Sequence, residues 1–231
     1  MDERYNSAFA TSAARGALMR LGLAEELGEL QYKKLSLITE EEGDRITDLA
    51  RAHGIRLHYF KRSNGTLPRV ARVLGFLKGI HFESILDVGS GRGVFLLPFL
   101  DAFPDIPAQA LDISDKRIEL LTDIKCGGIE RLSVKEGSIC DMPFPEDSFD
   151  VVTMLEVLEH IPDVRAAIRA AVRIAKKYVI VTVPSKEDDN PEHIHLLTKD
   201  VLTEMFTECG AHSLHFDGVH GHLIMIGKIG G

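Results

Sequence analysis

The chain has 231 residues, 45% of them hydrophobic and 27% charged, which excludes a mostly disordered, collagen-like or low-complexity chain. Acidic residues outnumber basic ones by 35 to 27, and the resulting net charge of −8 argues against non-specific binding of nucleic acid by the protein as a whole.

The cysteines and the N-terminal sequence indicate in which cellular compartment the protein is expected. Cys126, Cys140 and Cys209 form no C-x-x-C pair, so neither a zinc knuckle nor a thioredoxin-like redox motif is expected. Their low, odd number suits a reducing compartment. The N-terminus lacks a basic region followed by an apolar stretch, and no apolar run is long enough to span a bilayer. We therefore expect a soluble cytoplasmic protein with no membrane partner.

Residues 1–80 are expected to form an N-terminal helical segment. Residues 8–30 are rich in Ala, Leu, Met and Glu, and Gly22 and Gly28 are expected to break or end turns within them. Thr39, followed by three glutamates, predicts the N-cap of a second helix. Apolar residues spaced i, i+3, i+4 and i+7 from Val70 to Leu77 predict a third helix.

A stretch without any acidic residue spans positions 51–82. It holds seven basic residues, which are Arg51, Arg56, Lys61, Arg62, Arg69, Arg72 and Lys78. One interpretation is a solvated surface that balances acidic residues elsewhere in the fold. The other is a positively charged lip for an anionic substrate.

From residue 83 onward, short apolar runs alternate with helical stretches. Strands are predicted at 84–88, 109–113, 132–135, 149–154 and 178–183, and helices near 93–102, 116–124 and 164–175. This alternation predicts right-handed βαβ units, and the continuous apolar runs indicate a parallel sheet covered on both faces. A helix near 199–209 and two runs at 212–216 and 222–229 then predict an antiparallel pair at the end of the sheet.

The first predicted strand leads into a glycine-rich turn, L-D-V-G-S-G-R-G at residues 86–93. Its G-x-G-x-G spacing differs from the G-x-G-x-x-G dinucleotide fingerprint, which disfavours a nicotinamide dehydrogenase. Asp87 would repel a phosphate there and would attract an ammonium group. Asp112, at the end of the second predicted strand, is placed to accept hydrogen bonds from both ribose hydroxyls. These features favour a cofactor with a ribose and an amino acid but no phosphate.

Residues 86–93, Asp112 and residues 142–150 resemble class I S-adenosylmethionine-dependent methyltransferases. The resemblance implies a doubly wound, Rossmann-like α/β fold with a seven-stranded, mostly parallel sheet and an antiparallel last strand over residues 81–231. It implies that Gly89 and Gly91 line the methionine moiety and that Asp112 binds ribose. Either Ser138 or Asp141 would contact the adenine. The full candidate cofactor set is Asp87, Gly89, Ser90, Gly91, Asp112, Ile113, Ser138, Ile139, Asp141 and Leu155.

Acidic and imidazole side chains follow the fourth and fifth predicted strands. A helical turn after the fourth strand would place Glu156, Glu159 and His160 on one face, and His193 follows the fifth strand. These four residues are candidate ligands of Mg²⁺ or Mn²⁺, and a metal would activate an acceptor hydroxyl. Without metal, His160 or His193 would act as general base. In a metal-free enzyme the glutamates would only cap a helix or bind the backbone.

The Glu-x-x-Glu-His element resembles ubiquinone-pathway O-methyltransferases and small-RNA terminal 2′-O-methyltransferases. We therefore expect S-adenosylmethionine-dependent O-methylation of a small-molecule hydroxyl, with residues 1–80 as a cap or lid on the substrate side. The alternatives are a metal-dependent RNA 2′-O-methyltransferase, which the acid-free stretch favours, and a non-catalytic S-adenosylmethionine-binding partner protein. The oligomeric state stays open.

Overall fold

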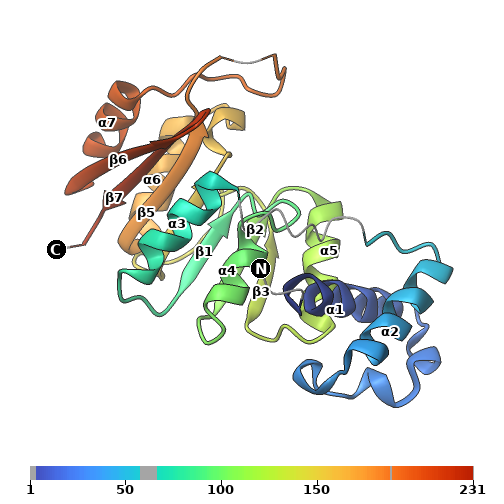
Figure 1. Cartoon of the computed structure of the whole chain (residues 1–231). Helices are drawn as coiled ribbons and strands as arrows, with labels where there is room; N and C mark the ends of the chain where they lie inside the picture. The colour runs from blue at the N-terminus through green and yellow to red at the C-terminus, as the bar shows by residue number, and fades with distance from the viewer. Residues whose placement is uncertain (1–3, 58–66, 188, 231) are drawn as a thin grey trace.

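The computed structural model describes residues 4–57, 67–187 and 189–230, and its centre is a seven-stranded sheet (Figure 1). The strands are β1 (Ile85–Val88), β2 (Ala108–Asp112), β3 (Leu132–Glu136), β4 (Phe149–Leu155), β5 (Ala175–Pro184), β6 (Ser213–Val219) and β7 (His222–Lys228). Their order is β3-β2-β1-β4-β5-β7-β6. Strands β1 to β5 pair in parallel, and β7 runs antiparallel to both β5 and β6. This arrangement confirms the predicted fold class.

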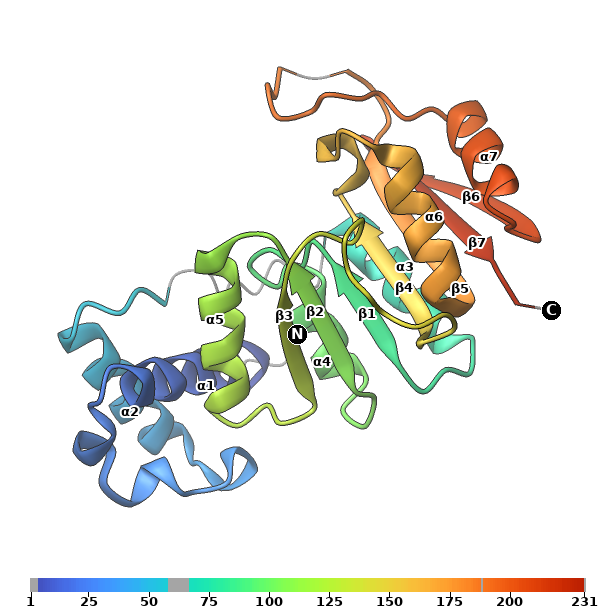
Figure 2. The same cartoon turned by 180° about the vertical axis from the view of Figure 1, so that it is seen from behind.

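Helices cover both faces of the sheet because alternate strand residues point to opposite faces. Ile85 and Val151 share one apolar cluster with residues of α3 (Pro68–Lys78), α4 (Leu96–Ala102) and α5 (Asp115–Cys126). Leu86 and Val152 share another with residues of α6 (Val164–Ile174) and α7 (Lys199–Glu208). Figure 1 shows α3 in front of the sheet, and Figure 2, seen from behind, shows α6 in front.

The helix after β1 starts later than its sequence predicts. Residues 89–95 form turns, and α4 begins only at Leu96. Gly93 has a φ of +77°, which a right-handed helix does not accept. The result is a longer loop between β1 and α4, at the carboxyl edge of the sheet where α/β proteins bind ligands.

The N-terminal segment is helical, as predicted. It comprises α1 (Arg4–Arg20), the 3₁₀ segments η1 (Ala24–Gln31) and η2 (Leu35–Leu37), α2 (Glu40–Ala52) and α3. Gly22 and Gly28 take positive φ angles of 76° and 55°, so the chain turns at both. Thr39 caps α2 in a capping box with Glu42. Helix α1 lies beside α5, and α2 packs on α1, beyond the β3 edge of the sheet (Figures 1 and 2).

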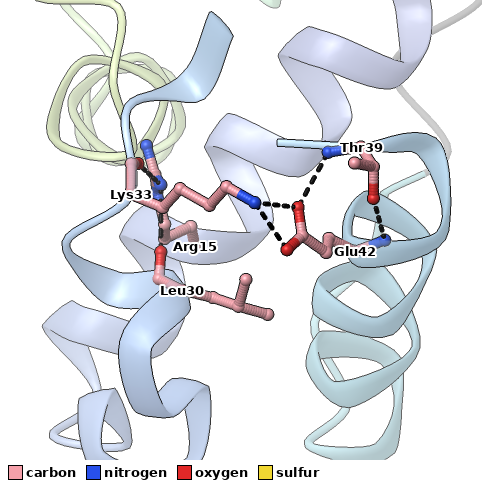
Figure 3. Close-up of polar contacts among 5 residues, drawn as sticks. All are labelled: Arg15, Leu30, Lys33, Thr39 and Glu42. Carbon is pink, nitrogen blue, oxygen red and sulfur yellow. Dashed lines mark hydrogen bonds and ion pairs between the residues drawn. The ribbon is translucent and has the colours of Figure 1, made fainter. Parts of the chain in front are cut away.

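Polar contacts join the parts of this segment to one another (Figure 3), and Arg15 also reaches the sheet domain. The Arg15 guanidinium, 4% exposed, donates from Nη1 to the carbonyls of Leu30 and Lys33 at 3.1 and 2.6 Å, and from Nε to that of Gly127 at 2.8 Å. Both carboxylate oxygens of Glu42 lie 2.6 Å from Lys33 Nζ. Arg15 thus satisfies backbone acceptors that the ends of η1 and α5 leave open.

Within the described part of the chain, no helix has the length and apolar character needed to cross a membrane.

Candidate active site

A cavity of about 650 Å³ opens at the carboxyl ends of β1, β2 and β4. That volume is typical of a site for a small molecule or cofactor. The predicted cofactor residues that line it are Asp87, Gly89, Ser90, Gly91, Asp112, Ile113, Ser138, Ile139 and Leu155. Asp141 is not among the described lining residues; its N–H donates to Ser138 O in a turn beside them. Ser138 is therefore the better placed of the two candidates for the adenine.

The glycine loop gives the cavity a wall made of backbone. Gly89 and Gly91 have φ angles of +65° and +58°, in the left-handed region that favours glycine. A Cβ atom at Gly89 would lie 2.5 Å from Val157 Cγ2. The Gly89 N–H donates to Leu111 O at 2.7 Å, which ties the loop to β2. Side chains at these positions would strain the loop or fill the space where a ligand approaches the backbone.

Asp112 joins two loops at the end of β2. Its Oδ2 accepts a hydrogen bond from Gly91 N at 2.8 Å, and its Oδ1 accepts one from Ser114 N at 3.0 Å. Arg117 Nη1 lies 3.7 Å from Oδ2. A carboxylate accepts about four hydrogen bonds, so Asp112 retains capacity for two ribose hydroxyls. Ile113, 74% exposed, offers an apolar surface at the rim of the cavity.

Asp87 is a buried acid that lines the same cavity. Burial raises the pKa of its carboxyl group to about 7, although hydrogen bonds with Thr153 and Ser90 oppose the change, and the charge of Asp112 raises the pKa further. Thr153 Oγ1 donates to Asp87 Oδ1 at 2.7 Å. A cationic group in the cavity would favour the charged carboxylate. The cavity therefore fits an ammonium group as well as a ribose.

Glu156 does not lie on a helical turn with Glu159 and His160, so that prediction is wrong. Strand β4 continues to Leu155, Glu156 has a φ of +58°, and a short 3₁₀ turn covers only Leu158–His160. Its Oε1 accepts a hydrogen bond from Thr182 Oγ1 at 2.7 Å, and its Oε2 lies 2.9 Å from His222 Nδ1. The positive φ angle thus turns Glu156 toward β5 and β7.

Glu159, His160 and His193, by contrast, come together. One ligand atom from each lies within 4.8 Å of the others, and the group so defined among the described residues does not include Glu156. Ile194 N donates to Glu159 O at 2.9 Å, which brings the later loop to this position. His160 Nδ1 lies 2.9 Å from the carbonyl oxygen of Glu192, so in the neutral ring Nδ1 carries the hydrogen and Nε2 has the free lone pair.

The donor chemistry of this trio, one carboxylate and two imidazoles, fits a divalent transition metal such as Mn²⁺ or Zn²⁺ better than Mg²⁺. His160 also lines the cavity, so the trio adjoins it. A general-base role for His160 or His193 stays a prediction.

Several lining residues were not predicted from the sequence. They are Arg69, Val70, Arg92, Val94, Phe95, Arg117, Val157, Ile161, Pro162 and Glu192, besides backbone neighbours of the glycine loop. Arg69 and Val70 belong to α3, whereas the described residues of 4–57 do not line the cavity. The lid function of residues 1–80 therefore stays a prediction that centres on α3.

The structure pairs part of the acid-free stretch with acidic residues. Arg51 Nη1 lies 2.6 Å from Asp48, and Arg72 Nε lies 3.1 Å from Asp217. Arg69 Nε lies 4.0 Å from Glu156 Oε1. Lys61 and Arg62 lie outside the described residues. These pairs favour the interpretation that the stretch balances acids elsewhere in the fold.

Comparison with known proteins relates this fold and its glycine loop to methyltransferases. Residues 86–182 match the family described as a methyltransferase domain. A 27-O-demethylrifamycin SV methyltransferase of Amycolatopsis mediterranei is 28% identical over 166 residues, 64% of this chain and 61% of the relative. A ubiquinone/menaquinone biosynthesis C-methyltransferase of Rickettsia massiliae is 33% identical over 98 residues, 40% of each chain.

Among solved structures, magnesium protoporphyrin IX methyltransferase from Synechocystis with bound SAH (S-adenosylhomocysteine) has a TM-score of 0.56 at 16% identity, covering 71% of this chain and 83% of that one. This likeness shows the fold. The chain spans less than two thirds of the curated relatives described above. The matched family region runs from β1 into β5 and includes the glycine loop, Asp112 and Glu156 to His160. The chain therefore matches the methyltransferase-domain family over residues 86–182, within a fold that it shares with S-adenosylmethionine-dependent methyltransferases.

Proposed function

We propose that this protein is an S-adenosylmethionine-dependent methyltransferase that methylates a hydroxyl oxygen of a small molecule. The observation that carries the proposal is the cavity that combines Asp87, the glycine loop and Asp112. A buried acid, an approachable backbone and a second acid suit the amino group, the methionine chain and the ribose of this cofactor. The Synechocystis neighbour, which was solved with bound SAH, supports the same ligand class.

The bound cofactor supplies a methyl group already activated on a sulfonium. The chain's own residues then have to position the two reactants, and orientation supplies much of the rate enhancement. Asp112 and the Gly89–Gly91 backbone hold the cofactor at the carboxyl edge of the sheet. Asp87 is mostly protonated in the ligand-free cavity below pH 7, and it releases its proton when it pairs with the cofactor's ammonium group.

The choice of oxygen as the acceptor atom rests on the polar wall of the cavity, because the named relatives include both an O- and a C-methyltransferase. Glu156, His160 and Glu192 all line the cavity. A hydroxyl acceptor has to lose a proton when its oxygen is methylated, and these side chains offer proton acceptors close by. A sulfide acceptor, by contrast, has no proton to lose and would need no proton acceptor.

A metal-dependent form of the same reaction is favoured by the Glu159, His160 and His193 trio. These three side chains would hold the ion, which would polarise the acceptor hydroxyl and lower its pKa. The Nδ1–H of His160, bound to Glu192 O, would fix the orientation of that ligand.

The two alternative functions make different predictions. RNA 2′-O-methylation requires RNA binding that weakens steeply with salt, and the pairing of Arg51, Arg69 and Arg72 with acids argues against it. A non-catalytic partner protein would bind the cofactor without any turnover.

The test is transfer of label from methyl-tritiated S-adenosylmethionine to catechol, phenol or glycerol, with Mn²⁺ or with chelator. We expect labelled methyl ether, and faster labelling with Mn²⁺ if the trio holds a metal. Label found on carbon, or on RNA in preference to these acceptors, would contradict the proposal. The same measurement on His193→Ala separates a metal effect at the trio from an effect of free Mn²⁺.

A further inference from the structure

The position and contacts of Glu156 indicate a role separate from that of the candidate metal ligands Glu159, His160 and His193. It is one of two non-glycine residues with positive φ among those described, and the other, Asp147, lies in a turn away from the cavity lining. Strained backbone of this kind persists where the surrounding structure fixes it, and it clusters at functional sites. Glu156 stands at the carboxyl end of β4 and lines the cavity.

Three elements hold the Glu156 carboxylate in place. Its backbone N–H donates to Thr182 O at 2.9 Å, and Thr182 Oγ1 donates to Oε1 at 2.7 Å, both from β5. His222 Nδ1, at the start of β7, lies 2.9 Å from Oε2. Arg69 Nε, on α3, lies 4.0 Å from Oε1. The Glu156 side chain is 21% exposed, so its carboxylate remains accessible from the cavity although these contacts fix its orientation.

We propose that Glu156 binds the acceptor hydroxyl and takes its proton during methyl transfer, with Thr182 and His222 as positioning residues. This rests on the proposed function. As the acceptor oxygen forms its bond to the methyl carbon, the carbon–sulfur bond breaks and its electron pair stays on sulfur. The acceptor O–H bond releases its proton to the Glu156 carboxylate, which passes it to solvent after the product leaves. Sulfonium and alcohol thus become thioether, ether and one proton.

The contacts favour Glu156 over His160 as this proton acceptor. The basic nitrogen of His160, Nε2, faces the buried Glu159 carboxylate at 4.0 Å and belongs to the trio. The Glu156 carboxylate is instead oriented by Thr182 Oγ1, which donates to Oε1, and it stays partly exposed at the cavity.

The test compares Glu156→Gln with wild type, and Asp217→Asn serves as the matched control. Asp217 is also a carboxylate paired with an arginine, but it lies on β6 outside the described cavity lining. With catechol as acceptor, we expect kcat of Glu156→Gln to fall about 100-fold, with unchanged affinity for S-adenosylhomocysteine and unchanged melting temperature. Asp217→Asn should retain wild-type kcat.

His222 is tested as a positioning residue by two variants. His222→Leu removes the group at Nδ1 and should lower kcat about tenfold with little change in KM. His222→Asn keeps a polar group at that position and should recover most of the loss. If kcat falls equally in both variants, or falls in proportion to the melting temperature, the contact between His222 and Glu156 is only structural.

If none of the acceptors is methylated, the affinity of the protein for each acceptor is measured directly. Catechol, phenol and glycerol are titrated into the protein saturated with S-adenosylhomocysteine, and Glu156→Gln should weaken the tightest of them about tenfold. An unchanged kcat or unchanged acceptor affinity in Glu156→Gln overturns the inference and leaves the proposed function standing. A saturated complex that binds none of these hydroxyl compounds also overturns it. Absence of S-adenosylhomocysteine binding in wild type instead overturns the proposed function.

Discussion

Asp87 illustrates how a residue suited to binding can weaken the ligand-free fold. Its carboxyl pKa is raised to about 7 by burial, far above that of the unfolded chain. The native protein therefore binds this proton more tightly, and the free energy of unfolding falls as pH rises from about 4 to about 7. The charged form becomes favourable once a cationic ligand is bound, so the acid is explained by binding rather than by folding.

Asp87→Asn removes this titration. We expect the variant to gain stability over wild type, and the gain to be about 2–3 kcal/mol larger at pH 8 than at pH 5. The same change should weaken S-adenosylhomocysteine binding, because the amide carries no charge for the ammonium group. Urea unfolding at both pH values measures the first effect. Asp217→Asn, at a half-buried carboxylate paired with Arg72, should show no such pH-dependent gain. An equal gain in both variants would contradict this explanation of the Asp87 pKa.

The position of most candidate cofactor residues on the cavity could be predicted from the sequence, because a strand and a glycine turn place them locally. Asp87, Gly89 and Asp112 sit at strand ends whose positions follow from the apolar runs. Glu156 was misplaced because a positive φ at a glutamate leaves no signal in the pattern, and its partners Thr182 and His222 come from strands far along the chain. Arg69 was missed as a lining residue because only tertiary packing brings α3 to the cavity.

At the scale of elements, helices α1 and α5 pack with almost no space between their backbones. A Cβ atom at Gly16 of α1 would lie 1.9 Å from Asp123 O, and one at Gly127 would lie 1.7 Å from Ser12 O. Ser12 Oγ donates to Ile124 O at 2.6 Å across the same contact. Glycine in mid-helix is unfavourable by itself, so its presence in α1 is explained by this close approach.

Gly16→Ala and Gly75→Ala form a matched pair, since both glycines lie inside helices. A Cβ atom at Gly75 of α3 meets nothing within 4 Å. Gly75→Ala should therefore raise the free energy of unfolding by about 0.5–1 kcal/mol, through helix propensity alone. Gly16→Ala should lower it by about 2 kcal/mol or more, because the helices have to separate. Urea denaturation gives both values, and a stabilised Gly16→Ala would show that α1 does not pack on α5 in this way.

At the scale of the whole molecule, the N-terminal segment divides into two parts. Helix α1 attaches to α5 through buried contacts, α2 packs on α1, and α3 reaches the cavity with Arg69 and Val70. The first part is expected to stabilise the protein without touching the ligand. The predicted lid would then involve α3, which the sequence analysis placed in one helical segment with α1 and α2.

Arg15→Met tests this division. The substitution keeps the length of the side chain but leaves the carbonyls of Leu30, Lys33 and Gly127 without their donor. We expect a loss of about 3 kcal/mol in the free energy of unfolding, with unchanged affinity for S-adenosylhomocysteine in the folded protein. Arg51→Met, at an exposed i,i+3 pair with Asp48, should change stability by less than about 0.5 kcal/mol. A large loss of ligand affinity in Arg15→Met would contradict the division.

The most direct measurement is a calorimetric titration of the full chain with S-adenosylhomocysteine, beside the same titration of Gly89→Ala. A Cβ atom at Gly89 would collide with Val157 in a backbone conformation that alanine disfavours, at the wall where we place the methionine chain. We predict micromolar binding by wild type and at least about tenfold weaker binding by Gly89→Ala. A folded wild-type sample that releases no binding heat across several temperatures would contradict the assignment of this cavity to the methyl donor.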